Sequence, residues 1–509
     1  MCFVYFVVGV YKANHESHEK NTNRSADKEM GWIQKCDIDD ELLPVPTQIV
    51  SNEEFEPPDQ TEDQKRVGHR VKEIADETSK RLGISRRKFL ASTGGMAAAF
   101  LAMNEVFGNF FDVSASELLE RRASDEKFPK RPFIFDIHTH HVAAPKIIKT
   151  PPLIPGYRAA GAAWGNKAIE GREHKWEDLY LENYIKEMFL DSDTSMAVIT
   201  GLPARADDQN VLTPAEMIET RARINGLAKS KRIVAHGLFS PDMGKSDLEA
   251  MQRQHEQLKV EAWKGYPGQP LADGSVGWWM DDEKIAYPAY EYSRKIGIKN
   301  ICVHKGLPLP GWEIEHSSPR DVEKAAKDFP DLNFLIYHAG FKGVRDAMPA
   351  VNDGFKTITN VPWISDLCAM RKRNPKMTNV YMDLGTTFGM TVITQPVLCA
   401  YMLGLMIDAF GEDHVLWGTD SIWWGSPQWQ IEAFRRLQMP EDLQKRFGFK
   451  PLTDKVKEKI FGLNSAKVYG IDVKAKMNAI PSDYVTKLKV NYRAEGAQPS
   501  NTQYGWVRR

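Results

Sequence analysis

Short apolar runs alternate along the chain with longer stretches whose apolar residues recur at helical spacing. This rhythm is typical of parallel strands joined by crossover helices, and eight runs predict an α/β protein with a (β/α)₈ TIM barrel. The runs cover 133–138, 196–201, 233–239, 260–264, 300–304, 333–338, 379–384 and 414–418. An open doubly wound sheet would require a glycine-rich phosphate loop after the first strand, where this chain has two histidines. We therefore expect a barrel over 130–472 and a C-terminal extension over 473–509.

The N-terminal part has a different pattern. Residues 1–84 are mainly charged and polar, which predicts a poorly ordered leader. Arg86 and Arg87 then precede a small apolar run at 91–103, and this order resembles a twin-arginine export signal, which we place at 85–115. The run is far shorter than the roughly 20 residues of a membrane-spanning helix. An ordinary helix with two exposed arginines is the alternative.

The signal interpretation predicts the location of the protein. Residues 113–115 (Val-Ser-Ala) offer a cleavage site, and we expect the twin-arginine export machinery to deliver the protein to the periplasm. A cytoplasmic protein is the alternative. The stretch before the arginine pair is unusually long for such a signal, and Met30 is an alternative start.

Composition and charge narrow the kinds of partner. Hydrophobic residues make up 42% and charged residues 27% of the chain, which is typical of a globular protein. The formal net charge of −1 gives no general attraction to nucleic acid, so we expect a small-molecule substrate instead. The five cysteines are scattered and show no paired spacing, which excludes a cysteine zinc motif. A metal site in this chain must therefore use histidines and carboxylates.

Candidate ligands stand at the ends of several predicted strands. Strand alternation places His138 and His140 on one face of the first strand, where two imidazoles can share a metal ion. This motif alone is weak evidence. However, His304, His338 and Asp420 end the fifth, sixth and eighth runs, and the carboxyl ends of barrel strands are where active sites are built. Together these residues favour a metal-dependent enzyme over isolated structural histidines.

The motifs around these residues resemble those of a known family. They are D-I-H-T-H at 136–140, V-H-K-G at 303–306, I-Y-H-A-G at 336–340, W-G-T-D-S at 417–421 and K-I-F-G-L-N-S-A-K-V-Y-G at 459–470. In order, strand context and identity they resemble the amidohydrolase-related (amidohydrolase 2) family, in the branch that includes aminocarboxymuconate-semialdehyde decarboxylase. The resemblance covers approximately residues 131–471.

This resemblance implies a role for each matched residue. A single divalent metal ion is expected to be ligated by His138, His140, His304 and Asp420, while His338 stays off the metal and exchanges a proton with the reacting water, a role that Asp420 could share. Three imidazoles and one carboxylate suit Zn²⁺, with Mn²⁺ or Fe²⁺ as alternatives.

Other residues are candidates for contact with the substrate. Arg205 follows the second run and Lys264 ends the fourth, and either side chain could bind an acidic group of the substrate. The simpler interpretations are that Arg205 is a solvated loop residue and that Lys264 belongs to a buried ion pair. Trp423 and Trp424 follow Asp420 and could form an aromatic wall, or could pack only against the barrel.

Two further carboxylates have less certain roles. Asp136 lies on the face of the first histidine pair and could support the ligands, whereas Asp383, at the end of the seventh run, is expected to be structural.

The ligand set fits two reactions. The first is hydrolysis, in which metal-activated water attacks a carbonyl of a small cyclic or aromatic substrate. The second is non-oxidative decarboxylation of an aromatic or unsaturated acid, which requires a positive clamp on the carboxylate. A non-catalytic binding protein is disfavoured because every ligand type is present. A homo-oligomer is left open.

Overall fold

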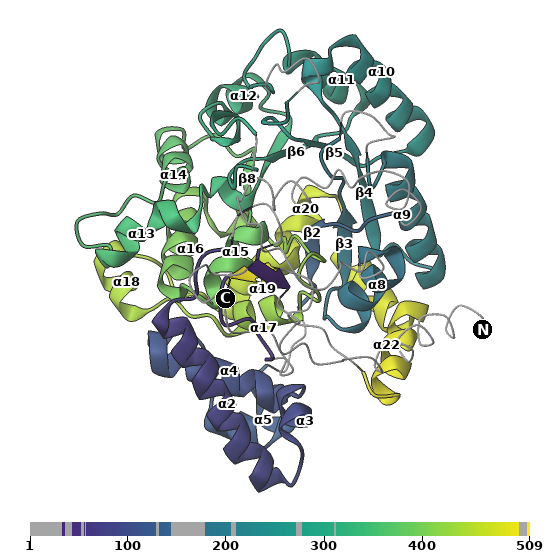
Figure 1. The fold of residues 1–509 in the computed structure, drawn as a ribbon. Helices are drawn as coiled ribbons and strands as arrows, with labels where there is room; N and C mark the ends of the chain where they lie inside the picture. The colour runs from purple at the N-terminus through teal and green to yellow at the C-terminus, as the bar shows by residue number, and fades with distance from the viewer. Residues whose placement is uncertain are drawn as a thin grey trace, which may run out of the picture.

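The centre of the molecule is a closed barrel of parallel strands (Figure 1). The computed structural model describes residues 33–35, 43–51, 55, 57–128, 132–143, 179–204, 210–270, 277–309, 312–497 and 506–508. Eight strands pair in chain order from β2 to β9. The Ile137 N–H donates to the Trp417 carbonyl (3.0 Å) and the His140 N–H to the Ser421 carbonyl (2.7 Å), so the first strand joins the segment after the last. The predicted TIM barrel is confirmed.

Every strand of the barrel overlaps one predicted run. The strands are β2 Phe135–Thr139, β3 Met196–Ile199, β4 Ile233–Leu238, β5 Ala262–Gly265, β6 Asn300–His304, β7 Asn333–Tyr337, β8 Val380–Asp383 and β9 Val415–Leu416. The pairing register of β2 with β3 shifts between Asp136 and Thr139. The regular alternation expected for this strand is therefore interrupted just where the histidine pair begins.

The strands place alternate residues in different cores. Cys302, Leu335 and Tyr337 belong to a buried cluster with side chains from β2, β3, β4 and β9, which is the barrel interior. Their neighbours Val303 and Ile336 pack instead in the large cluster that includes the surrounding helices. This in-and-out pattern is what a filled barrel with a helical coat requires.

Helices surround the barrel and close one of its ends. The main ones in the coat are α8 Leu181–Ile185, α9 Pro214–Ala228, α10 Lys245–Arg253, α11 Tyr287–Ile296, α12 Val322–Asp328, α13 Val344–Asn352, α14 Ile364–Arg373, α15 Gly385–Val392, α16 Pro396–Phe410, α17 Gln428–Arg436, α18 Glu441–Phe447 and α19 Asp454–Glu458. At the amino ends of the strands, α20 (Asn464–Val468) covers the barrel: the Asn300 side-chain amide donates to the Val468 carbonyl (3.1 Å). The mouth of the barrel is therefore at the opposite end.

A helical unit precedes the barrel. It comprises α2 Glu62–Leu82, α3 Arg86–Leu90, α4 Thr93–Phe107 and α5 Arg121–Lys127. Thr61 and Gln64 form a capping box at the start of α2, and Gly83 ends it in the left-handed conformation. This helix lies within the predicted leader, 1–84, most of whose other residues lie outside the described part of the chain. The buried Val67, Val71 and similarly spaced residues form a narrow stripe that pairs with α4, although most of the helix surface is charged.

The predicted signal segment packs on the barrel. The rings of Phe100 in α4 and Phe111 lie 4.8 Å apart, and Phe111 forms a backbone bridge with Leu437. The buried guanidinium of Arg436 pairs with Glu117 at 2.7 Å. These contacts make residues 93–117 part of the folded body, and they leave the export prediction itself untested.

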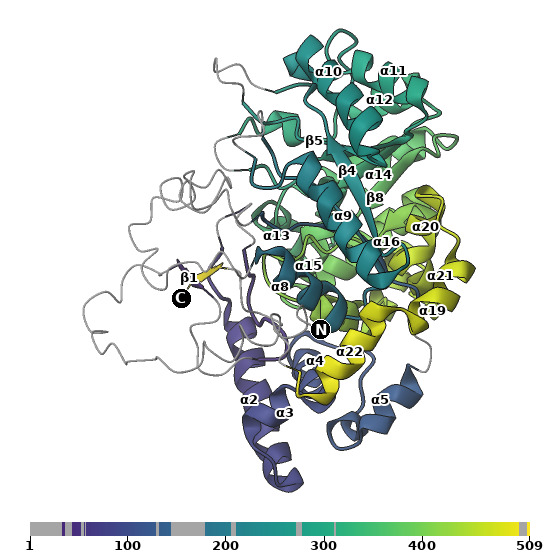
Figure 2. The ribbon, with the colours of Figure 1, turned by 90° about the vertical axis from the view of Figure 1, so that its right-hand side faces the viewer.

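A short strand from the leader pairs with one near the C-terminus on the mouth side. β1 (Ile33–Lys35) pairs antiparallel with β10 (Trp506–Arg508), and in Figure 2 both lie on the side of the barrel away from α20. Between β1 and α2, residues 44–46 and 48–51 are buried. The Gln48 amide donates to the Arg508 carbonyl (3.0 Å), and the Arg508 guanidinium donates to the Pro57 carbonyl (3.1 Å). These bonds attach residues 48 and 57 of the leader to the C-terminal strand β10.

The C-terminal extension also contains two helices, α21 Val473–Ala479 and α22 Tyr484–Ala494. Asp483, which caps α22, forms a buried ion pair with Arg232 at 2.6 Å, and this pair fixes the extension beside the amino end of β4. None of the helices in the described part of the chain combines the length and apolarity that a membrane span needs.

Candidate metal centre

Three potential ligands converge at the mouth of the barrel. His138 and His140 are at the carboxyl end of β2, and Asp420 follows β9. One ligand atom from each residue lies within 4.8 Å of the others. Asp420 Oδ1 is 3.3 Å from His138 Nε2 and 3.2 Å from His140 Nε2. The structure therefore brings together three of the four predicted ligands.

Hydrogen bonds fix which nitrogen of each imidazole faces Asp420. His138 Nδ1 is 2.9 Å from Asp383 Oδ2, and His140 Nδ1 is 2.8 Å from the Thr200 carbonyl. A carbonyl or carboxylate oxygen can only accept, so each Nδ1 carries the proton and each Nε2 presents a lone pair.

This arrangement fits a metal ion. Two lone pairs facing a carboxylate oxygen repel one another, and a cation between them removes the repulsion. Burial, together with the Lys264 charge, lowers the pKa of His138 well below its usual value, so the imidazole stays neutral as a ligand must. Two imidazoles and one carboxylate suit a divalent transition metal such as Zn²⁺.

Asp420 is held in an unusual backbone conformation. Its φ is +57°, in the left-handed region that non-glycine residues rarely adopt. Its N–H donates to the His138 carbonyl (2.8 Å), and the Thr386 hydroxyl donates to Oδ2 (2.5 Å). Strain of this kind persists only where surrounding contacts maintain it, and such residues cluster at functional sites.

His304 and His338 form a second pair beside these three ligands. His304 ends β6, and His338 directly follows β7 with φ +62°. His304 Nδ1 is 3.2 Å from His338 Nε2, and His304 Nε2 is 3.2 Å from the Leu307 carbonyl. The rings of His338 and His138 are 4.9 Å apart. The pair is therefore adjacent to the metal group, and the roles of His304 as ligand and His338 as proton carrier stay predictions.

Lys264 supplies a buried positive charge. It lies in β5 with no exposed surface, and its ammonium is 3.5 Å from the centre of the Tyr337 ring and 4.9 Å from that of Tyr266. These are cation–π distances. After burial, the Lys264 charge is the next cause that lowers the pKa of His304, to about 3. Lys264 thus belongs to the electrostatics of the site, and its contact with substrate stays a prediction.

The two tryptophans after Asp420 occupy different surroundings. The ring of Trp423 lies 5.6 Å from that of His140 and is 6% exposed. Trp424 is 2% exposed and packs in the large cluster of barrel and helices. Of the two predicted wall residues, Trp423 is the one beside the metal group, while the position of Trp424 suits packing. Arg205 lies outside the described residues.

Three residues that support the ligands were not predicted as functional from the sequence. Asp383 orients His138, and Thr386 holds Asp420. Gly385 has φ +45°, and a Cβ atom there would lie 3.0 Å from His338 Nδ1 and 3.1 Å from both Asp383 Oδ2 and His138 Nδ1. The sequence feature that could have identified these residues is the D-L-G-T-T motif, which stands at the end of the seventh run, beside strands that end in histidines.

Asp136 has a supporting role as well. It accepts from the N–H of His138 (3.1 Å) and from the N–H (3.1 Å) and hydroxyl (2.5 Å) of Thr419. The carboxylate therefore ties the two segments that carry the ligands to each other. Burial raises its pKa to about 7.

Comparison with known proteins places the chain in a family. A family model described as amidohydrolase matches residues 135–471, and the chain belongs to this family of metal-dependent enzymes. No curated protein matches the chain.

Several solved structures are similar to the chain at low sequence identity. An uncharacterised TIM-barrel protein from Bordetella bronchiseptica is 17% identical with a TM-score of 0.42, covering 66% of this chain and 98% of its own. A 2,6-dihydroxybenzoate decarboxylase from Rhizobium is 15% identical with a TM-score of 0.37, covering 67% and 99%. A 4-oxalomesaconate hydratase from Rhodopseudomonas palustris is 18% identical with a TM-score of 0.39, covering 71% and 100%.

Proposed function

We propose that the protein is a metal-dependent hydrolase that acts on a carbonyl group of a small cyclic or aromatic substrate. The observation that carries this proposal is the convergence of His138 Nε2, His140 Nε2 and Asp420 Oδ1 at the barrel mouth. These three residues would hold the metal ion, with His304 as the fourth ligand. When bound, the metal would act as a Lewis acid that activates water and polarises the carbonyl.

His338 is suited to accept a proton from the attacking water. Burial lowers its pKa well below the usual value, so the ring is neutral and has a lone pair to receive a proton. Its Nε2 lies 3.2 Å from His304, and its backbone is held by the Thr387 hydroxyl, which donates to the His338 carbonyl (2.7 Å). A ring fixed in this way can deliver the proton to the leaving group in the second half of the reaction.

Trp423 favours a planar substrate. Its indole lies beside His140 and is almost fully enclosed by the protein. An aromatic surface next to the reacting centre stabilises ring substrates through stacking and apolar contact.

Non-oxidative decarboxylation is the second candidate, and Lys264 favours it. A decarboxylase must neutralise and orient the substrate carboxylate, and the buried Lys264 ammonium affects the pKa of His138, His304 and His338. Because the Lys264 ammonium lies over the Tyr337 ring, its positive charge is located in the barrel interior.

One experiment separates the two reactions. Metal-loaded protein would be incubated with a panel of lactones, aryl esters, amides and hydroxylated benzoic acids, with liquid chromatography of products and measurement of released CO₂. Ring opening or ester cleavage without CO₂ supports the hydrolase. Release of stoichiometric CO₂ from an aromatic acid would instead support the decarboxylase and overturn the hydrolase. Lack of turnover of every ester, lactone and amide would count against the hydrolase.

A further inference from the structure

A cavity of about 260 Å³ lies on the carboxyl-end side of the barrel strands, where the leader meets the loop after β6. Its walls come from the loop after β6, the segment after β7, α15 and the N-terminal leader. The lining residues are Ile49, Phe55, Pro58, Leu307, Pro308, Lys342, Gly343, Val344, Arg345, Asp346 and Met390. The volume is slightly below the ~300–1,000 Å³ typical of ligand pockets, which suits a compound with a single ring.

The leader wall is firmly attached to the protein. Ile49 is 4% exposed and belongs to the main hydrophobic core. The Ser51 hydroxyl donates to the Phe55 carbonyl (2.5 Å), and the Arg508 guanidinium donates to the Pro57 carbonyl (3.1 Å). The leader residues that face the cavity are thus positioned by the fold although they lie outside the matched family region.

The cavity and the predicted ligands share two structural elements, the loop after β6 and α15. Leu307 lines the cavity, and its carbonyl lies 3.2 Å from His304 Nε2. Met390 lines the cavity one helical turn after Thr386, which holds Asp420. A compound in the cavity would therefore contact Leu307, which bonds to His304, and the helix α15 that carries Thr386.

The cavity combines an apolar lining with one excess positive charge. Lys342 and Asp346 pair at 2.7 Å and offset each other. Arg345 is exposed, and no hydrogen bond or ion pair links its guanidinium to the residues that the structure describes. Apolar side chains such as Phe55 and Met390 provide the remaining surface. This chemistry suits an apolar ring that carries one anionic group.

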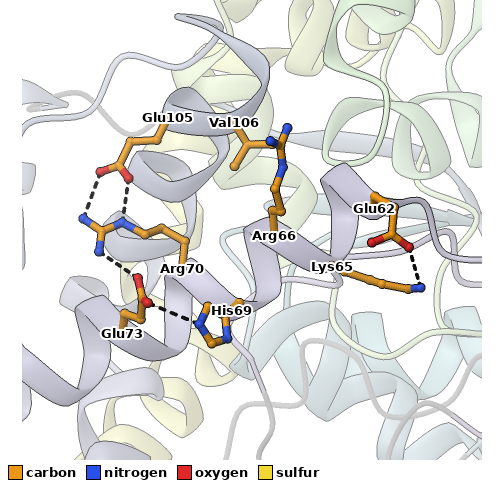
Figure 3. A pocket seen from close by; sticks show the side chains of 8 residues that line it. All are labelled: Glu62, Lys65, Arg66, His69, Arg70, Glu73, Glu105 and Val106. Carbon is orange, nitrogen blue, oxygen red and sulfur yellow. Dashed lines mark hydrogen bonds and ion pairs between the residues drawn. The ribbon is translucent and has the colours of Figure 1, made fainter.

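A larger hollow on the outside of α2 lacks these properties (Figure 3). Arg70 pairs there with Glu105 (2.6 Å) and Glu73 (3.0 Å), and Lys65 pairs with Glu62 (2.8 Å). Its charged side chains are mostly exposed and form ion pairs with neighbouring side chains, so they offer no unpaired charge to a ligand.

We propose that the cavity at the mouth binds an aromatic or alicyclic acid, and that Ile49 and Phe55 of the leader determine which rings are accepted. That this ligand is the substrate rests on the proposed function, whereas its binding to the cavity does not. The leader is then a specificity element added to the family barrel.

Isothermal titration of metal-loaded protein with benzoate and with its neutral analogue benzamide tests this proposal. Phe55→Ala should weaken binding of both compounds about two- to tenfold, since one aromatic contact is lost. Arg345→Gln should weaken benzoate alone and abolish the preference for benzoate over benzamide. Metal content should be the same in all variants. Phe107→Ala is the matched control, because Phe107 also packs partly buried on the core in the N-terminal unit but does not line the cavity.

The outcomes separate this proposal from the proposed function. Benzoate binding that is equal in wild type, Phe55→Ala and Arg345→Gln would place benzoate elsewhere, for example on the metal, and would overturn the cavity proposal. Binding that depends on both residues supports the proposal even in a protein that hydrolyses none of the tested esters, lactones or amides. If Phe55→Ala fails to fold, Ile49→Val and Arg345→Gln provide the same comparison with smaller changes.

Discussion

Asp383 Oδ2 lies 2.9 Å from His138 Nδ1, and both side chains are buried. The carboxylate therefore fixes the imidazole with Nε2 directed at Asp420. Residues that orient a ligand in this way typically contribute 10- to 100-fold to metal affinity.

We expect Asp383→Ala to lower metal affinity by about that factor, because the His138 ring loses its fixed orientation. Competition with a chromogenic chelator would measure the change. Asp331→Ala removes an exposed carboxylate of the same kind and should have no effect. Equal affinity in Asp383→Ala and wild type would show that Asp383 does not orient the ligand.

His304→Ala should empty the metal site, because it removes the fourth predicted ligand. Elemental analysis of the purified variant gives the answer directly. In the structure His304 contacts Leu307 and His338 and lies outside the group of three ligands. The variant therefore tests directly whether His304 binds the metal. A full equivalent of metal in His304→Ala would remove His304 from the ligand set.

His338→Ala should retain its metal and lose turnover by ~10²–10⁴-fold, the usual cost of losing a general base. The paired measurements are metal content and kcat on the best substrate from the panel. Metal-free protein in this variant would instead identify His338 as a ligand.

Gly385→Ala should weaken metal binding and destabilise the protein. A Cβ atom at φ +45° would press against His138 Nδ1, His338 Nδ1 and Asp383 Oδ2. Gly83→Ala is a close control: Gly83 has φ +63° and open space around its Cβ position, so it has only the backbone cost of ~1–3 kcal/mol. Metal affinity should fall in Gly385→Ala and remain normal in Gly83→Ala.

The buried His141 should make folding stability depend on pH. Burial lowers its pKa to about 4 in the folded protein, against about 6.5 in an unfolded chain. Between these two pH values the unfolded state binds more protons than the folded state. The contribution of His141 to the free energy of unfolding is therefore complete above pH 6.5 and is lost as the pH falls toward 4. The loss amounts to about 3 kcal/mol at most. Its Nε2 contacts the Thr220 hydroxyl at 2.7 Å. Urea unfolding at pH 7.5 and 5 should show a smaller pH dependence in His141→Gln than in wild type.

Export remains a proposal with its own test. Replacing Arg86 and Arg87 with lysine should leave the protein in the cytoplasm, while the retained charges preserve the contact of residue 86 with Asp76, which is 3.0 Å in the wild type. Cell fractionation measures the change. Cleavage at residues 113–115 would remove Ile49 and Phe55, which line the cavity. We therefore also expect the exported protein to retain its leader, and measurement of its intact mass would test this. Unchanged periplasmic material in the double lysine variant would exclude the twin-arginine route.

The barrel and the ligand positions could be predicted because they follow local patterns. His138, His304 and Asp420 each end an apolar run, and the runs matched the strands. The supporting contacts could not be predicted, since the choice of Asp383 as the partner of His138 depends on how β2 and β8 are placed in the closed barrel.

The helix α2 within the leader could not be predicted for a different reason. The charged surface of α2 hides a narrow apolar stripe, and its stability comes from α4 and the barrel, not from its own sequence. Likewise, nothing in the sequence around Phe55 indicates that it meets Leu307 and Met390, because all three are brought together only by tertiary packing.

The ligands lie at the seam where the barrel closes. Asp136 and Thr419, which tie the two sides of this seam, are 283 positions apart in the chain. A nascent chain therefore carries His138 and His140 long before Asp420 has been synthesised. Until the last strand has left the ribosome, the imidazoles that precede it lack the Asp420 carboxylate, so the complete ligand set is not yet available to a metal ion. The centre can thus be complete only when the two sides of this seam have come together.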